Sequence, residues 1–105
     1  MTEPAFVVLM RVHLHFPDAG SLKGKRAELN RIKAHLRDRC GASVAEVAYQ
    51  DTWQRSTLAV ALAAGSPGRC NEAADGVCRL LDARFPQGVR VERQLASWND
   101  LESLA

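Results

Sequence analysis

The segment "ASVAEVAYQDTWQRSTLAVALAA", residues 42–64, places two strand-like runs next to each other with no helix between them. Residues 42–49 and 56–64 are rich in apolar residues, and in the second run leucine and valine alternate with threonine and alanine. Alternation with period two is typical of a strand that buries one of its faces. We therefore predict a β-hairpin at the centre of the chain, with its turn at residues 50–55.

The predicted turn contains no glycine, proline or asparagine, the residues that tight hairpin turns favour. Its large polar and aromatic residues, which we call the hairpin signature, are Gln50, Asp51, Trp53, Gln54 and Arg55. Such side chains indicate contacts beyond the hairpin itself. For Asp51 two roles stay open. One is a structural clasp, in which its carboxylate accepts N–H groups of the turn or pairs with Lys25 or Arg26 of the neighbouring loop, and the other is direct contact with a ligand.

A strand and a helix precede the hairpin. Residues 6–16, "FVVLMRVHLHF", alternate with period two, and one of the two faces is continuously apolar. Ser21 is a good N-cap for a helix that carries an apolar stripe from Leu22 to Leu36, and Gly41 ends it.

A helix and a strand also follow the hairpin. Ser66 and Pro67 form a favourable helix start, and "PQG" ends that helix. Residues 89–95, "VRVERQL", alternate as a last strand, and residues 96–105 form a short C-terminal tail. The order β-α-β-β-α-β predicts an α+β fold, a ferredoxin-like sandwich in which a four-stranded antiparallel sheet carries two helices on one face. From the length we expect residues 1–105 to form a single domain.

This topology leaves the second face of the sheet open, and it gathers the hairpin turn and the start of the first helix at one end. The open face carries Arg11, His13 and His15 beside small residues of the strand at 56–64. It lacks the aromatic residues with which RNA-recognition motifs stack bases, whereas a small, flat face suits packing against another sheet. One alternative function is therefore a protein–protein adaptor that forms a homodimer through this face.

The two histidines of the open face raise the question of a metal site. His13 and His15 can supply two ligands, and Asp51 or Glu46 would have to supply a third. A further alternative is therefore a small metal-dependent enzyme that uses His13, His15 and Asp51. No spacing in the sequence matches a P-loop, a catalytic triad or a zinc-binding cysteine pair. We accordingly expect no catalytic residue, no metal and no cofactor, although enzymatic activity stays open.

Positive charge is concentrated in the first predicted helix. Residues 22–39 contain seven Lys or Arg against two acidic residues, although the whole chain carries only +2. A helix N-terminus followed by a ridge of cations fits phosphate groups. The predicted RNA- or anion-binding residues are Ser21, Lys23, Lys25, Arg26, Lys33 and Arg37. The favoured function is a non-enzymatic protein that binds ribosomal or other structured RNA.

The location of the protein is inferred from its N-terminal region. The apolar run at residues 5–10 is too short to span a bilayer, and no basic region precedes it as in a signal peptide. We therefore expect a cytoplasmic protein with no membrane partner.

Two blocks, "RVHLHFPDAGSLKGKR" at residues 11–26 and "ASVAEVAYQDTWQRSTLAVA" at residues 42–61, resemble the YlxP-like family of small bacterial proteins of unknown function. The residues that match its two signatures are Ser21, Leu22, Lys23, Lys25 and Arg26, and Ala45, Glu46, Val47, Gln50, Asp51, Trp53 and Gln54. The resemblance extends over residues 6–95, although Gly24 and Tyr49 depart from the family pattern. It implies a ferredoxin-like fold. It also implies a translation-related partner, because genes of this family often lie beside those for translation initiation and ribosome maturation factors.

Overall fold

The computed structural model describes residues 3–104, in which it contains four strands and three helices. In chain order these are β1 (Phe6–His15), α1 (Leu22–Cys40), β2 (Ser43–Ala48), β3 (Arg55–Ala64), α2 (Pro67–Arg84), β4 (Arg90–Ser97) and α3 (Trp98–Glu102). The predicted order is confirmed as far as β4. The tail differs from the prediction, because β4 continues to Ser97 and a short helix follows it. A capping box between Ser97 and Asp100 starts that helix.

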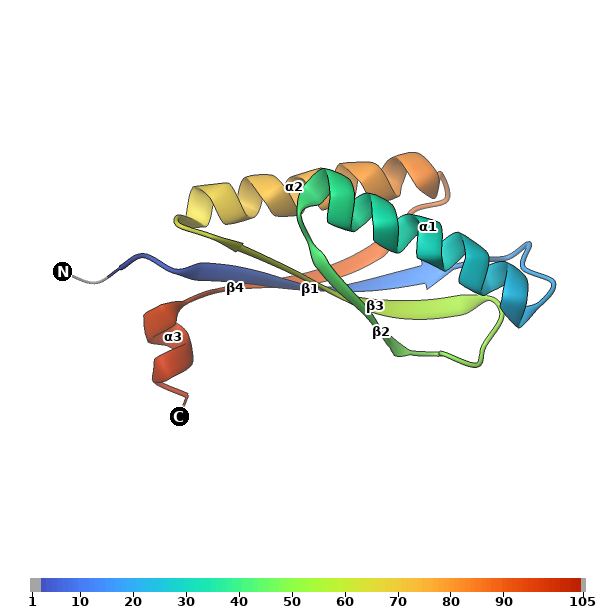
Figure 1. The fold of residues 1–105 in the computed structure, drawn as a ribbon, viewed down its shortest axis with the longest axis horizontal. Coiled ribbons are helices and arrows are strands. Elements are labelled where there is room, and N and C mark those ends of the chain that lie inside the picture. Colours follow the sequence, from blue (N-terminus) through green and yellow to red (C-terminus); the bar gives the residue numbers. More distant parts are fainter. Residues whose placement is uncertain (1–2, 105) are drawn as a thin grey trace.

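The sheet is antiparallel with the strand order β2-β3-β1-β4, so β1 and β3 are central and β2 and β4 are the edges. Helices α1 and α2 cover one face, and α3 projects on the opposite side near the N-terminal end of β1 (Figure 1). This is the predicted ferredoxin-like sandwich with one open face.

The core lies between the sheet and the two covering helices. The alternation of β1 turns Val8, Met10 and Val12 toward the helices, where each is at most 1% exposed. Ile32 of α1 and Leu81 of α2 belong to the same cluster and are fully buried. Each buried apolar side chain of this size stabilises the fold by roughly 1.5–3 kcal/mol. The pattern of the sequence thus decides which face of the sheet the helices cover.

The helix ends predicted from the sequence are confirmed. The hydroxyl of Ser21 accepts from the backbone N–H of Gly24 at 3.0 Å, and Ser66 accepts from Arg69 at 3.2 Å. Gly41 follows α1 in the left-handed conformation, with φ of 69°. These caps satisfy backbone groups that the helices themselves leave free.

The hairpin turn lies against the loop that leads from β1 to α1. The backbone N–H of Phe16 donates to the carbonyl of Gln54 at 2.8 Å, and the side-chain amide of Gln54 donates to the carbonyl of Pro17 at 3.2 Å. Beside this junction, a cleft of about 420 Å³ lies among the end of β1, the first turns of α1 and residues 84–87. The gathering of these segments at one end of the molecule, predicted from the topology, is confirmed.

Candidate functional site

Four cations of α1 lie in one row, which we call the basic stripe: Lys23, Arg26, Lys33 and Arg37. At 3.6 residues per turn they fall within a sector of about 80°, and at about 1.5 Å per residue the row is about 21 Å long. Arg37 shows that the row faces the edge strand β2, because its guanidinium donates to the carbonyl of Val44 at 3.4 Å. Within residues 3–104, no carboxylate lies within ion-pair distance of the stripe. Its charge is therefore available to an external anion.

Lys25 does not belong to this surface, which corrects its assignment as an anion-binding residue. The residue is only 1% exposed. Its ammonium donates to the carbonyl of Tyr49 and lies 3.0 Å from the carboxylate of Glu46. Since both partners belong to the hairpin, Lys25 ties α1 to the hairpin and would have to leave the core to contact a phosphate.

A clasp between the hairpin and α1 therefore exists, but its carboxylate is not that of Asp51. Glu46 pairs with Lys25 and also accepts from the hydroxyl of Ser56 at 2.6 Å. The side chain of Glu46 is 16% exposed, so this cluster is largely shielded from water. Asp51 is exposed and takes no part in it. Direct contact with a ligand is the role that stays open for Asp51.

The clasp explains how the turn forms without glycine. Tyr49 has φ of 64°, in the left-handed region that costs a residue with a side chain of order 1–2 kcal/mol. Its carbonyl accepts from the N–H of Thr52 at 3.1 Å as well as from Lys25. The guanidinium of Arg55 lies 4.2 Å from the centre of the Tyr49 ring. These contacts offset the cost of the backbone conformation.

The hairpin presents two exposed aromatic rings beside the first turns of α1. Tyr49 is 41% and Trp53 is 51% exposed. Exposed aromatic rings stack on unpaired nucleic-acid bases, and an arginine beside a ring adds a cation that favours the same ligands. The hairpin thus exposes aromatic rings of the kind that the strands of the open face lack.

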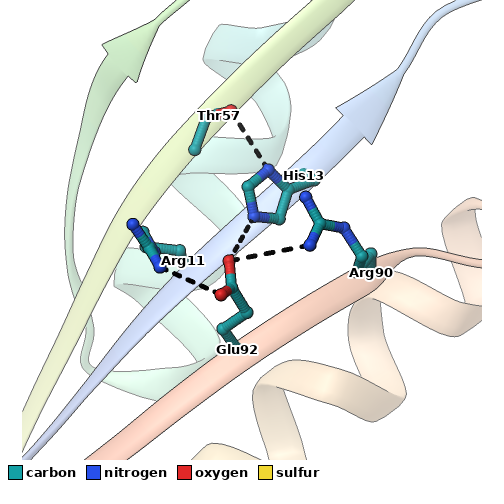
Figure 2. A network of polar contacts seen from close by, with 5 residues as sticks. All are labelled: Arg11, His13, Thr57, Arg90 and Glu92. Atoms are coloured by element: carbon teal, nitrogen blue, oxygen red, sulfur yellow. Dashed lines mark hydrogen bonds and ion pairs between the residues drawn. The ribbon is translucent and has the colours of Figure 1, made fainter.

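On the open face, a polar network surrounds Glu92 of β4 (Figure 2). His13 Nε2 lies 2.7 Å from one Glu92 oxygen, and the Arg11 guanidinium donates to the other at 2.9 Å. Arg90 lies 4.0 Å from Glu92, and the Thr57 hydroxyl lies 3.3 Å from His13 Nδ1. Two guanidinium groups and one imidazole therefore share a single carboxylate.

The environment of Glu92 lowers its pKa below the ordinary value of 4.5. The hydrogen bond with His13 is the largest cause, and partial desolvation opposes it. The hydrogen bond and charge of Arg11 and the charge of Arg90 lower the pKa further. Glu92 is consequently ionised at neutral pH, and the patch formed with the two arginines keeps one excess positive charge.

The residues proposed as metal ligands are not assembled. Glu92 and Thr57 occupy both ring nitrogens of His13. The chain between residues 3 and 104 contains no group of three or more His, Cys, Asp or Glu that could hold a metal ion. Asp51 therefore does not complete a site with His13 and His15 in this structure.

Cys40, the last residue of α1, is not an activated thiol. Burial raises the pKa of Cys40, against the opposing charges of Arg39 and Arg79. A nucleophilic cysteine needs the opposite shift of its pKa, because the thiolate is the reactive form.

No helix in residues 3–104 is long and apolar enough to cross a membrane.

Two features of the site were missed from the sequence, although each left a signal. Lys25 precedes Leu29, Ile32 and Leu36 at helical spacing, so its position on the buried side of α1 was readable. The alternation of β4 places Glu92 on the open face. Its pairing with His13, however, depends on the register between β1 and β4, which no local pattern reveals.

Comparison with known proteins gives a family and a fold. The model of a family described as "Protein of unknown function (DUF503)" matches residues 7–94. The chain is 39% identical over 70 residues to "Uncharacterized protein YlxP" of Bacillus subtilis (strain 168), which covers 67% of this chain and 75% of that protein. Among solved structures, the de novo designed protein Foldit4 is similar with a TM-score of 0.56 at 13% identity, over 88% of this chain and 96% of that chain. The last likeness concerns the fold alone.

Proposed function

The chain belongs to the DUF503 family of proteins of unknown function, and on that premise we propose that it is a non-enzymatic RNA-binding protein. The basic stripe would contact phosphates, and the exposed aromatic rings of the hairpin would stack on unpaired bases. The expected partner is ribosomal or other structured RNA with single-stranded segments, in a cytoplasmic setting.

The observation that carries this proposal is the basic stripe without carboxylate partners. Exposed cations are common on helices, but they are usually interspersed with acidic residues that neutralise them. Here the one lysine of α1 that is neutralised, Lys25, is the buried one. An unneutralised row gains binding free energy when it releases the counterions of a nucleic-acid backbone.

The position of the aromatic rings supports the same partner. The hairpin is bound to α1 through Lys25, so Tyr49 and Trp53 lie at the end of the helix where the stripe begins with Lys23. An RNA strand that runs along the basic stripe for about 21 Å would place several of its phosphates against the stripe before its bases reach the aromatic rings. Non-specific single-strand binding commonly combines a cationic track with such stacking residues.

The first experiment measures binding to bulk ribosomal RNA by fluorescence anisotropy over a range of salt concentrations. The test variant is Arg26→Ala/Lys33→Ala/Arg37→Ala, which leaves the buried Lys25 in place. With single-stranded contacts worth about 0.7 in the slope of log K against log salt, loss of three contacts should flatten the slope by about 2. Affinity at low salt should fall as well.

The matched control is Arg31→Ala/Arg69→Ala/Arg79→Ala, which removes the same number of exposed cations from outside the basic stripe. This control should bind nearly as well as the wild type, because the proposal assigns the contacts to one flank of α1. An equal loss of RNA affinity in both variants would mean that net charge alone, and not the basic stripe, determines binding. RNA binding that does not respond to salt would refute the proposal.

A second measurement tests the hairpin. The chain has two tryptophans, so a Trp98→Phe background leaves Trp53 as the single reporter. Stacking on a base should quench its fluorescence at saturating RNA, and Trp53→Ala should weaken binding by about 1–3 kcal/mol. Unchanged fluorescence at saturation would exclude the hairpin from the interface.

A further inference from the structure

The open face has two unlike ends. At the end nearest α3, Val7 of β1 lies between Ala63 and Ala96 of the neighbouring strands. Together with Trp98 and Leu101 they line an apolar groove of about 210 Å³. The opposite end carries the network around Glu92, with its excess positive charge (Figure 2).

Helix α3 presents its apolar side chains to solvent. It has no buried residue, and Trp98 and Leu101 are 59% and 47% exposed. Leu104, just beyond the end of the helix, is 81% exposed. The capping box and a backbone hydrogen bond of 2.9 Å from Trp98 to Ala5 hold the helix beside the sheet. A helix this short has little stability of its own in water. Exposed apolar groups fixed beside an apolar groove mark a surface that another surface covers.

We propose that the open face and α3 together form the interface of a twofold-symmetric homodimer. In such an interface the same patch meets itself, so each copy must offer both a projecting part and a receiving part. Here α3 projects on the side of the sheet that its own α1 and α2 leave uncovered (Figure 1). The middle of the sheet, where Leu9 is 50% exposed and lies between Ala61 and Gln94, would meet the same segment of the second copy near the twofold axis.

Charge complementarity selects a second copy and its orientation. Helix α3 carries Asp100 and Glu102 and no cation. The half of the open face that lies away from α3 carries Arg11, near the middle of β1, and Arg90, which pairs with His13 farther from α3. Their side chains are 64% and 69% exposed. A twofold axis that runs between the two faces and across the strands places α3 of each copy over this arginine-bearing half of the other. An axis along the strands would instead bring the acidic α3 helices together, which like-charge repulsion disfavours.

The area of the open face comes close to that of a stable dimer interface. The two central strands have ten residues each, and a four-stranded face of that length covers roughly 500–600 Å². Contacts of α3 add to this area. A standard stable interface buries about 800 Å² per partner, so the face and α3 together approach that value. The alanines of β3 allow a second sheet to pack closely.

Sedimentation velocity of the untagged protein, from about one to about one hundred micromolar, tests the proposal. The chain has a mass of 11.5 kDa, and the wild type should sediment at twice that mass at the upper concentrations. Leu9→Glu, which places two like charges near the axis, should sediment as a monomer with an unchanged far-UV circular dichroism spectrum. A monomeric wild type, or a dimer that survives Leu9→Glu, would overturn the proposal.

An exchange of charges tests how the two copies are oriented in the dimer. It uses exposed residues, so the result does not depend on a core substitution that could unfold the protein. Arg90→Glu and Glu102→Arg should each raise the dimer dissociation constant at least tenfold. The double variant in one chain should recover the wild-type dissociation constant, because each exchanged pair then attracts again across the interface. Arg79→Glu on α2 is the matched control and should leave the dimer intact, as should the variant of the basic stripe. Failure of the double variant to recover would overturn the placing of α3 over Arg90.

Discussion

Replacement of Lys25 by methionine isolates the ammonium group that ties α1 to the hairpin. Methionine keeps most of the apolar stem, so little cavity forms. It removes the donor to the Tyr49 carbonyl and the charge that lies 3.0 Å from Glu46. It thereby leaves a carboxylate that is only 16% exposed without a counter-charge.

The magnitude follows from the geometry. At the 3.0 Å separation of Lys25 and Glu46, the Coulomb attraction is about 5.5 kcal/mol at an effective dielectric constant of about 20. The variant no longer has to desolvate an ammonium, which returns part of that loss. Removal of one partner from a buried pair costs about 3–5 kcal/mol. We expect the lower end, about 3 kcal/mol, because Ser56 still donates to Glu46 and water reaches it in part.

Urea unfolding followed by circular dichroism, at one fixed protomer concentration, measures this cost. A loss of about 3 kcal/mol corresponds to a fall in Tm of roughly 12–15 °C for a domain of this size. Lys23→Met is the matched control, because Lys23 is exposed and its replacement should change the unfolding free energy by no more than about 0.5 kcal/mol. A cycle with Glu46→Gln should show a coupling above about 1 kcal/mol. A cost for Lys25→Met below about 1 kcal/mol, with no change of the m-value, would refute the reasoning.

Three further changes have outcomes that the structure predicts. Ser21→Ala removes the N-cap hydrogen bond to Gly24 and should lower the free energy of unfolding by about 1 kcal/mol, measured by urea titration. Met10→Ala empties a fully buried position between sheet and helices and should cost about 2–5 kcal/mol in the same assay. Glu92→Gln should matter most at neutral pH. The folded-state pKa of Glu92 lies below the ordinary 4.5, so its contribution is present above that value and is lost as pH falls through the folded pKa. The difference in urea midpoint between wild type and Glu92→Gln should therefore shrink between about pH 6 and pH 3, and a constant difference would contradict the assignment.

The order of the elements was readable from the sequence because the signals are local. Period-two alternation in residues 6–16 and 56–64 specifies strands, and Ser21, Gly41 and Ser66 specify helix ends through hydrogen bonds within a single turn. Once the order β-α-β-β-α-β is set, few antiparallel arrangements bury both helices against one sheet. The basic stripe was also readable, because helical spacing alone places its members on one flank.

The contacts between elements could not be read in the same way. Lys25 and Glu46 are 21 positions apart, and the pair forms only because α1 packs against the hairpin. His13 and Glu92 meet through the register of β1 and β4, which depends on the whole sheet. The sequence by itself therefore determined the elements as far as β4, the core face and the charged flank of this protein, whereas the short helix α3 was not predicted. Which lysine is buried, which carboxylate holds it and which apolar groups remain uncovered were decided only in the tertiary structure, because burial and ion pairing depend on neighbours that are distant along the chain.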